Sequence, residues 1–461
     1  MADESNELTV EHPLVRALAE QGPVGWTRLD AAFAVTVMGT IAQVVFFDGE
    51  QAVSVDPPES VLVLVPELRA AAARSGARVW WRMLLTLSDS GELAVDYDHG
   101  AEPFPAGQLF APEAYRADLE AYPRASVPVW LAAYIGHGDR QLRSPQQAAA
   151  QARADRAGQV WAVLAENEFP PFPLMWARWA TIAAAFVAAG SQRGPRMLPW
   201  IGIFEGSARG GSTLHALPAG RAVLSGGVWN APALEAVYNG GAPMPELYAG
   251  APDWVADPVL NPRAASGLLS FCYWWEAGRW YRGESPSAEQ CAAGVPGVWT
   301  AETVAEIVTG LLDTAVPDAV ASLISAAERG VVTRASLVEV FGDDGRFDID
   351  GALYQYSLAG LVSTAPEPMP AEEAISRVRD YIIGRGLDTT GYPLSQLVAH
   401  RLEVGWMVYV PVPDGEIAIG RAVFYVADDG VLEPATSSIA PAIYIVDFER
   451  RFAERHGALP A

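Results

Sequence analysis

The sequence predicts a multi-domain α+β protein built from antiparallel sheets with helices packed on them. Runs of β-branched and aromatic residues end in Gly-containing turns, which is typical of hairpins. Amphipathic stretches with apolar residues at helical spacing separate these runs. At 461 residues the chain is long for one hydrophobic core, so we expect several domains.

The first α+β module is expected over residues 1–140. Helices are predicted over 11–20, 56–74 and 112–122, and a pair of strands over 26–47 that breaks near Gly39. A hairpin is predicted from the strands 78–87 and 92–97, which turn at Asp89-Ser90-Gly91. This order implies one sheet with helices to one side.

A second α+β module is expected over residues 141–315. It opens with an Ala- and Gln-rich stretch, 141–156, which is either a linker helix or the start of this module. Trp176, Trp179 and Phe186 share one helical face, which favours core packing over a ligand cage. Strands are predicted over 200–204, 214–229 and 268–281, and helices over 231–238 and 296–312. Because this order resembles that of the first module, we interpret the two as a divergent duplication.

The remaining chain is expected to form a helical connector over 316–366 and a C-terminal α+β module over 367–461. Apolar spacing in the connector predicts a small three-helix unit. In the last module, a helix over 371–383 is predicted to cover strands over 407–412 and 417–426. These strands end in the turns Asp414-Gly415 and Asp429-Gly430.

The charge of the chain limits its partners. Its formal net charge is -24, so nucleic acid and anionic membranes are poor partners and a basic protein fits better, although acidity also serves solubility. Two cysteines, Cys272 and Cys291, make neither a disulfide framework nor a metal site, which favours a reducing compartment. The N-terminus lacks the pattern of a signal peptide, and the longest apolar run, 179–189, is too short to span a bilayer. We therefore expect a cytoplasmic protein.

No sequence motif indicates a catalytic site, a cofactor or a bound metal. The six histidines lack metal-ligand spacing, and the Asp residues over 343–350 do not fit a calcium loop. Glu166 and Glu168 form a possible glycosidase-like pair, but carboxylates so close in sequence rarely face one substrate. The Gly-rich stretches 208–211 and 225–227 lack the lysine and spacing of phosphate-binding loops.

The predicted first hairpin has Trp80 or Trp81 in one strand, a turn at Gly91 and the sequence Asp96-Tyr97-Asp98 at the end of the other strand. This pattern resembles the YezG-like immunity proteins of bacterial polymorphic toxin systems, and the resemblance covers about residues 20–125. The C-terminal module, with Glu433 and Ser437-Ser438 after an acidic-Gly turn, is similar to small immunity domains of actinobacterial toxin loci. The resemblance implies a non-enzymatic antitoxin that occludes the active site of a cognate secreted toxin, an NAD glycohydrolase or a nuclease.

Two loops carry the candidate partner-binding residues. The connection 242–262 is rich in Pro, Gly and Asp, and long loops of this kind are commonly functional or disordered. Aromatic anchors within a polar rim are typical of tight interfaces. The candidates are Tyr248, Asp253, Trp254 and Asp257 on this connection, and Asp96, Asp98 and Glu102 after the first hairpin.

Two alternatives remain open. One is a secretion chaperone or scaffold that escorts an effector. The other is a hydrolase with a site assembled from distant residues, using His215 or His400 with a carboxylate.

Overall fold

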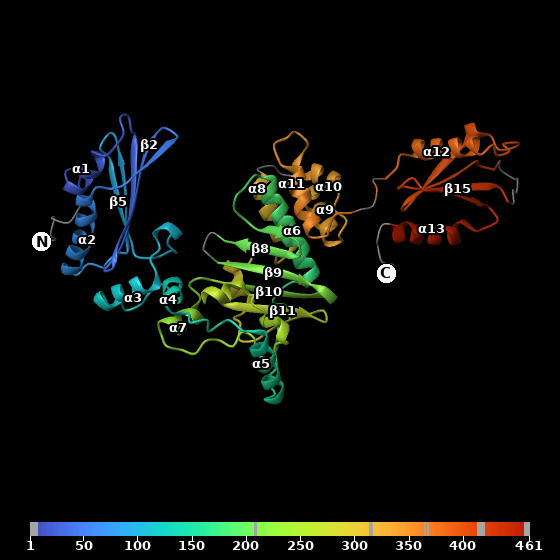
Figure 1. Cartoon of the computed structure of the whole chain (residues 1–461). Helices are drawn as coiled ribbons and strands as arrows, with labels where there is room; N and C mark the ends of the chain where they lie inside the picture. The colour runs from blue at the N-terminus through green and yellow to red at the C-terminus, as the bar shows by residue number, and fades with distance from the viewer. Residues whose placement is uncertain are drawn as a thin grey trace. The chain divides into compact units, whose positions relative to one another are not determined.

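The computed structural model describes residues 8–206, 210–312, 317–363, 366, 368–412 and 420–455. Helices and three antiparallel sheets alternate along the chain, as the α+β prediction requires (Figure 1). The chain divides into two compact units, one of residues 1–329 and 334–361 and one of residues 330–333 and 362–461. No helix among the described residues is both long and apolar enough to cross a membrane.

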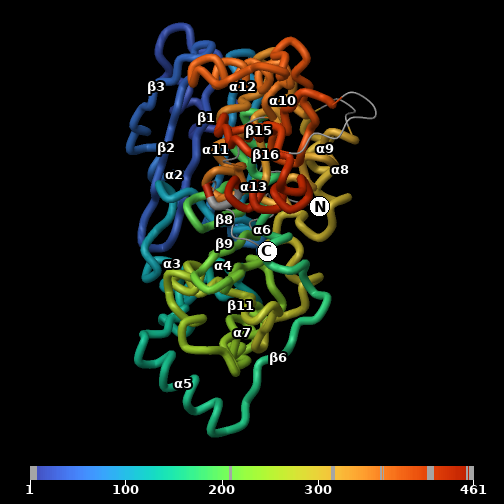
Figure 2. Tube along the Cα trace, turned by 90° about the vertical axis from the view of Figure 1, so that its right-hand side faces the viewer, coloured from blue at the N-terminus to red at the C-terminus, as the bar shows by residue number. Residues whose placement is uncertain are grey.

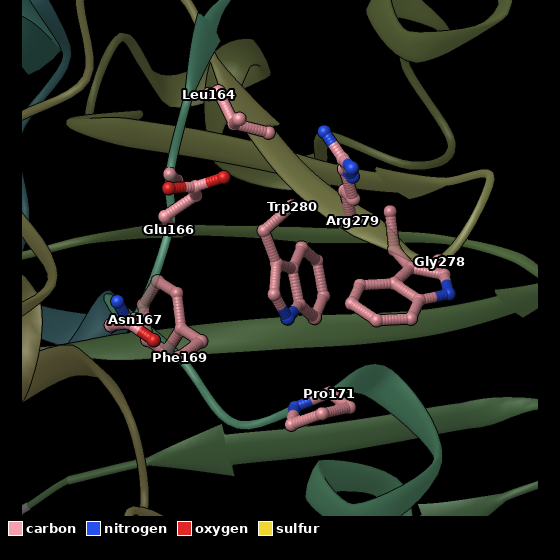
Figure 3. Close-up of a pocket in the computed structure, with 10 residues that line it drawn as sticks. Leu164, Glu166, Asn167, Phe169, Pro171, Gly278, Arg279 and Trp280 are labelled. Atoms are coloured by element: carbon pink, nitrogen blue, oxygen red, sulfur yellow. The ribbon is translucent and has the colours of Figure 1, made fainter.

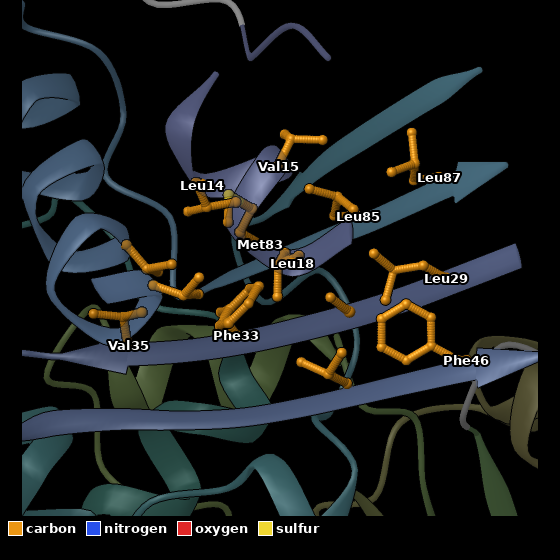
Figure 4. Packing of buried hydrophobic residues seen from close by; sticks show 14 of the residues in the cluster. Leu14, Val15, Leu18, Leu29, Phe33, Val35, Phe46, Met83, Leu85 and Leu87 are labelled. Carbon is orange, nitrogen blue, oxygen red and sulfur yellow. The ribbon is translucent and has the colours of Figure 1, made fainter. Parts of the chain in front are cut away.

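A five-stranded sheet forms the N-terminal part of the first unit, with the strand order β3-β2-β1-β4-β5. Its strands are β1 (Arg28–Thr36), β2 (Gly39–Asp48), β3 (Gln51–Val55), β4 (Arg82–Ser88) and β5 (Leu93–Asp98). Helices α1 (Pro13–Ala19) and α2 (Glu59–Arg74) supply Leu14, Leu18 and Val61 to a core with Phe33 and Phe46 of the sheet (Figure 4). Alternate strand residues point into this core, so one face of the sheet is apolar.

Three helices follow the five-stranded sheet: α3 (Pro112–Ala121), α4 (Val129–Gly136) and α5 (Pro145–Ala157). Trp81, Phe104, Tyr115 and Trp130 form an aromatic core between the sheet and the first two of these helices. Helix α4 lies beside α7 (Pro232–Tyr238), and both contribute to a small apolar cluster that includes Val129 (Figure 2). The five-stranded sheet is thereby joined to the seven-stranded sheet within one compact unit.

The seven-stranded sheet has the order β6-β12-β11-β10-β9-β8-β7. Its strands are β6 (Val163–Leu164), β7 (Arg196–Leu198), β8 (Ile201–Glu205), β9 (Gly211–Leu217), β10 (Arg221–Gly227), β11 (Phe271–Glu276) and β12 (Arg279–Arg282). From β7 to β12 each strand pairs with the next along the chain, whereas β1 pairs with β4 in the first sheet. A duplication that kept its topology would have given both sheets the same strand order. The two sheets differ in topology, so they do not meet this requirement.

Helices α6 (Phe172–Ala188) and α11 (Ile349–Leu358) pack against strands on one face of the seven-stranded sheet. Helices α8 (Ala301–Leu312), α9 (Pro317–Glu328) and α10 (Arg334–Phe341) pack in turn on α6 or α11. Trp179 of α6 lies against Gly202 of β8, where a Cβ atom would meet the indole at 2.8 Å. The connection 242–262 lies on the opposite face, where Val255 packs with Val223 and Trp274.

The expectation of a separate helical connector over 316–366 is wrong. Its helices belong to the first unit, where α9 and α11 pack on α6 and α10 packs on α9 and α11. The Trp176 indole N–H donates to the Ala359 carbonyl at 2.9 Å, and the Met197 N–H donates to Gln355 Oε1 at 2.7 Å. Apolar spacing predicted three helices correctly but could not show that their partner is α6.

The second unit is a four-stranded sheet between two helices, with the order β13-β14-β15-β16. Its elements are α12 (Ala371–Gly384), β13 (Val398–Leu402), β14 (Gly405–Tyr409), β15 (Ala422–Ala427), β16 (Leu432–Thr436) and α13 (Pro441–Arg455). Helix α12 packs on the face that includes Phe424, and α13 packs on the opposite face, where Phe448 meets Tyr425 (Figure 1). The predicted turn at Asp414-Gly415 lies outside the described residues.

Candidate functional site

Three chain reversals lie at the same end of the seven-stranded sheet. The register places Leu198 opposite Ile201, Leu217 opposite Arg221, and Glu276 opposite Arg279. Because neighbouring strands are antiparallel, the turns β7–β8, β9–β10 and β11–β12 lie at the same end of the strands. The residues that follow β6 reach this end as well, since the Ala165 N–H donates to the Trp280 carbonyl at 2.9 Å. We call this end of the sheet the turn end.

Residues other than glycine adopt positive φ in each of these turns. The values are 64° at Trp200, 63° at Ala219 and 50° at Ala277, and Asn167 after β6 has 61°. Among the described residues only Asp139 and Gln159 share this feature. The left-handed region costs a residue with a Cβ roughly 1–2 kcal/mol, and such strain tends to gather at functional sites. The concentration of strained residues therefore makes the turn end the strongest candidate for a binding surface.

Trp200 is the most prominent side chain of the turn end. It follows Pro199 in a two-residue turn, at a position where positive φ normally selects Gly or Asn. Its backbone is fixed, because the Ala216 N–H donates to the Trp200 carbonyl at 2.8 Å, yet 66% of the residue's surface is exposed. An exposed indole on a fixed backbone resembles the aromatic anchors that carry binding energy at interfaces.

A pocket of about 300 Å³ opens at the β6–β12 side of the turn end. Phe169, Trp275 and Trp280 supply its aromatic wall. Glu166 and Arg279 flank the Trp280 indole at its rim (Figure 3). Neither of these charged side chains makes an ion pair or hydrogen bond with another described residue. The pocket therefore offers an aromatic surface between two uncompensated charges of opposite sign.

Glu168 fixes the segment that carries Glu166. Its carboxylate accepts hydrogen bonds from Tyr273 Oη at 2.9 Å, Arg282 Nε at 3.0 Å and the Ala288 N–H at 3.0 Å. These partners occupy Glu168, while Glu166 is exposed in the pocket. The two carboxylates thus have different environments, and Glu168 has a structural role.

The structure brings three candidate residues of the connection 242–262 together. Asp253, Trp254 and Asp257 line one small cavity of about 170 Å³, and both carboxylates are exposed. The Arg221 guanidinium lies 4.9 Å from the centre of the Trp254 ring. Because Arg221 begins β10, this contact joins the connection to the turn end.

Tyr248 requires a correction. It is only 6% exposed and packs in the core with Ala148 and Leu247, so it cannot serve a partner as a surface anchor. Burial raises the pKa of its hydroxyl. Cys272 raises this pKa further, and the charge of Arg143 opposes the shift. The sequence of a Pro- and Gly-rich connection does not show whether its aromatic residue faces solvent or packs on the sheet.

The candidates after the first hairpin differ in environment. Asp98 pairs with Arg82 Nε at 2.9 Å and accepts the Gly100 N–H at 2.7 Å, which makes it a structural residue. Asp96 is exposed on β5. Glu102 is exposed beside an open pocket that Phe204 and Glu205 also line.

Neither of the two histidines considered for a hydrolase forms a hydrogen bond or ion pair with an acid in the part of the chain that the structure describes. His215 is 6% exposed, and its Nε2 has no hydrogen-bond partner among the described residues. Burial lowers the pKa of His215, while the charge of Asp257 opposes this effect. His400 is exposed on β13. Within the described ranges, no three potential metal ligands form a cluster.

No family model matches the chain, and no curated protein matches it. The site therefore depends on geometry. Sequence reasoning missed Trp200 and Arg279, and it considered Glu166 only as half of a carboxylate pair. Pro199 between two β-type runs was the available signal, because a proline there marks a turn and makes Trp200 a turn residue.

Proposed function

We propose that this chain is an immunity protein that binds a cognate toxin protein and blocks its active site, using the turn end as its binding surface. The observation that supports this most directly is the exposed, conformationally strained Trp200. A fold that keeps a large indole in a glycine-type turn position forgoes stability at that point, and partner binding accounts for such a residue.

Exposed carboxylates at other positions along the turn end support a basic partner. Asp253, Asp257 and Glu166 are exposed close to the turn end, and the whole chain carries a net charge of -24. Complementary charge accelerates encounter between proteins and disfavours wrong partners. Aromatic anchors within an acidic surface match a cationic cleft that handles nucleotides or nucleic acid, which is the type of toxin that the resemblance implies.

Co-expression tests this proposal. A toxin domain encoded beside this chain would be produced in a sensitive host with and without the protein, and growth would be measured. Restored growth together with a stable one-to-one complex supports an immunity function. Unchanged killing with altered export of the toxin would support the chaperone alternative instead.

The contribution of charge is tested with the double variant Asp253→Asn, Asp257→Asn. We expect slower association with the toxin and a weaker dependence of the rate on salt, because these carboxylates steer the encounter. The matched control is Glu372→Gln, an exposed carboxylate on α12 of the second unit. An unchanged association rate in the double variant would remove these residues from the interface.

A further inference from the structure

Another pocket lies in the N-terminal part of the first unit, beside the hairpin that carries Asp96-Tyr97-Asp98. Its volume is about 270 Å³. Leu68, Ala72 and Trp80 form its apolar wall, and Arg78, Tyr97 and His99 are its polar lining residues. The proposed toxin binding uses none of these side chains.

Two arginines and one histidine gather around this pocket. Arg124 Nη2 donates to the Val79 carbonyl at 2.6 Å, and His99 Nδ1 lies 3.2 Å from the same oxygen. Because a carbonyl oxygen only accepts, Nδ1 of His99 carries the proton. Arg78 is exposed and makes no ion pair or hydrogen bond with another described residue. The pocket therefore has a cationic rim in a strongly acidic protein.

Nearby carboxylates offset the charge of this cluster only in part. Asp118 accepts two hydrogen bonds from Arg69, at 2.8 and 2.6 Å, and one from the Trp81 indole at 3.0 Å. Asp98, the carboxylate nearest in sequence to His99, is held by Arg82. Both acids are thus committed to other arginines, and positive charge remains in excess around the pocket.

Arg124 has more hydrogen-bond donors than the described residues around it can accept from. Its guanidinium stacks 3.4 Å from the centre of the Trp81 ring. Nε and Nη1 are enclosed and have no partner among the described residues. Burial lowers the pKa of Arg124 to about 10, and the neighbouring Arg69 and Arg78 add to this effect against the attraction of Asp118. A buried donor without an acceptor is costly, and a nearby anion would reduce that cost electrostatically.

We propose that this pocket binds a small organic anion, with its phosphate or carboxylate group held by the Arg78 guanidinium and the protonated His99 ring and its apolar body against Leu68 and the partly exposed Tyr97. Arg124, which donates to the same Val79 carbonyl that His99 contacts, adds positive charge nearby. Guanidinium and imidazolium groups form strong charge-assisted hydrogen bonds with such oxygens, and an aromatic wall suits an attached ring.

Calorimetric titration of the full chain tests the proposal with four probes. Phenyl phosphate and benzoate share the ring and differ in the anion, inorganic phosphate lacks the ring, and benzamide lacks the charge. Saturable binding of phenyl phosphate or benzoate supports the proposal, and the stronger of the two identifies the anion. Binding of inorganic phosphate alone, binding of benzamide with equal affinity, or binding of none of the four overturns it.

Substitutions locate the binding. Arg78→Gln is expected to weaken the anion by about tenfold or more, because it removes a charge-assisted contact. The matched control is Arg153→Gln on the exposed face of α5, which should leave the affinity unchanged. Equal affinities for both variants would overturn the assignment, and thermal melts of both variants show whether the fold is kept.

His99 gives a second readout that does not depend on a substitution. Burial lowers its pKa, and the charges of Arg78 and Arg124 act in the same direction, whereas the Val79 carbonyl and Asp98 oppose them. Tyr97, whose pKa burial raises, stays neutral in this range. A bound anion should raise the pKa of His99 in an NMR titration and bind more tightly below about pH 6 than above about pH 7.5. An unchanged His99 titration at saturating probe would contradict the site.

Discussion

Arg69 and Asp118 form a bidentate ion pair in the interior of the N-terminal part of the chain. Their side chains are 3% and 0% exposed. Asp118 also accepts the Val37 N–H at 3.0 Å, so one carboxylate links α3, α2 and the end of β1. Both charges are fully partnered, which is the condition under which an ion pair is tolerated in a protein interior.

Asp118→Asn is expected to lower the free energy of unfolding by about 3–5 kcal/mol, because Arg69 would be left as a buried charge without a counter-ion. Urea unfolding followed by tryptophan fluorescence measures this loss. Asp96→Asn is the control, since Asp96 is exposed on β5, and it should be near neutral. A loss as small as that of the control would contradict the central role of the pair.

His215 is expected to make stability depend on pH. Its folded-state pKa is lowered, chiefly by burial, so below about pH 6.5 the unfolded chain takes up a proton that the folded chain resists. Stability contributed by neutral His215 is therefore lost as the pH falls. His215→Leu should unfold with a flatter pH dependence between about pH 7 and pH 5. Parallel profiles for variant and parent would show that His215 does not titrate differently on folding.

The helices over 317–361 are expected to be required by the first unit. A chain that ends at residue 363 should unfold cooperatively and remain monomeric. A chain that ends at residue 312 should aggregate or melt earlier, because it loses the Arg178–Glu328 contact at 2.8 Å and uncovers Trp176 and other apolar residues of α6. Size-exclusion chromatography with thermal melting compares the two. Equal behaviour would restore the idea of a separate connector.

Trp200 and Trp161 are expected to respond differently to glycine. Both are exposed, at 66% and 74%, but only Trp200 has positive φ. Trp161→Gly should cost roughly 0.5–1 kcal/mol in backbone entropy, whereas at Trp200 relief of strain offsets that cost. The unfolding free energy of Trp200→Gly should therefore be equal to or above that of the parent protein. A clear loss would mean that the indole stabilises the fold.

Hydrophobic periodicity predicted much of the fold, and its failures have physical causes. The helix α13 was not predicted, because residues 442–448 are β-branched and aromatic and suit a strand equally well. Its packing on Tyr425 decides the conformation. The short edge strand β3 is mostly exposed and has little apolar alternation to reveal it.

The candidate site was less accessible from sequence. The trio Asp253, Trp254 and Asp257 was predicted and lies together, but their contact with Arg221 depends on how the connection crosses the sheet. Tyr248 was wrongly placed at the surface for the same reason. Trp200, Ala219 and Ala277 all lie at the turn end because of the strand order of the sheet. No local sequence pattern determines that order.

The central claim, that the turn end binds a cognate toxin through Trp200, is tested most directly by the dissociation constant of the complex for Trp200→Gly and Trp161→Gly. We predict that Trp200→Gly weakens binding by roughly 30-fold or more, equivalent to at least about 2 kcal/mol, while Trp161→Gly changes it less than about twofold. Full affinity of the Trp200→Gly variant for the toxin would contradict the claim.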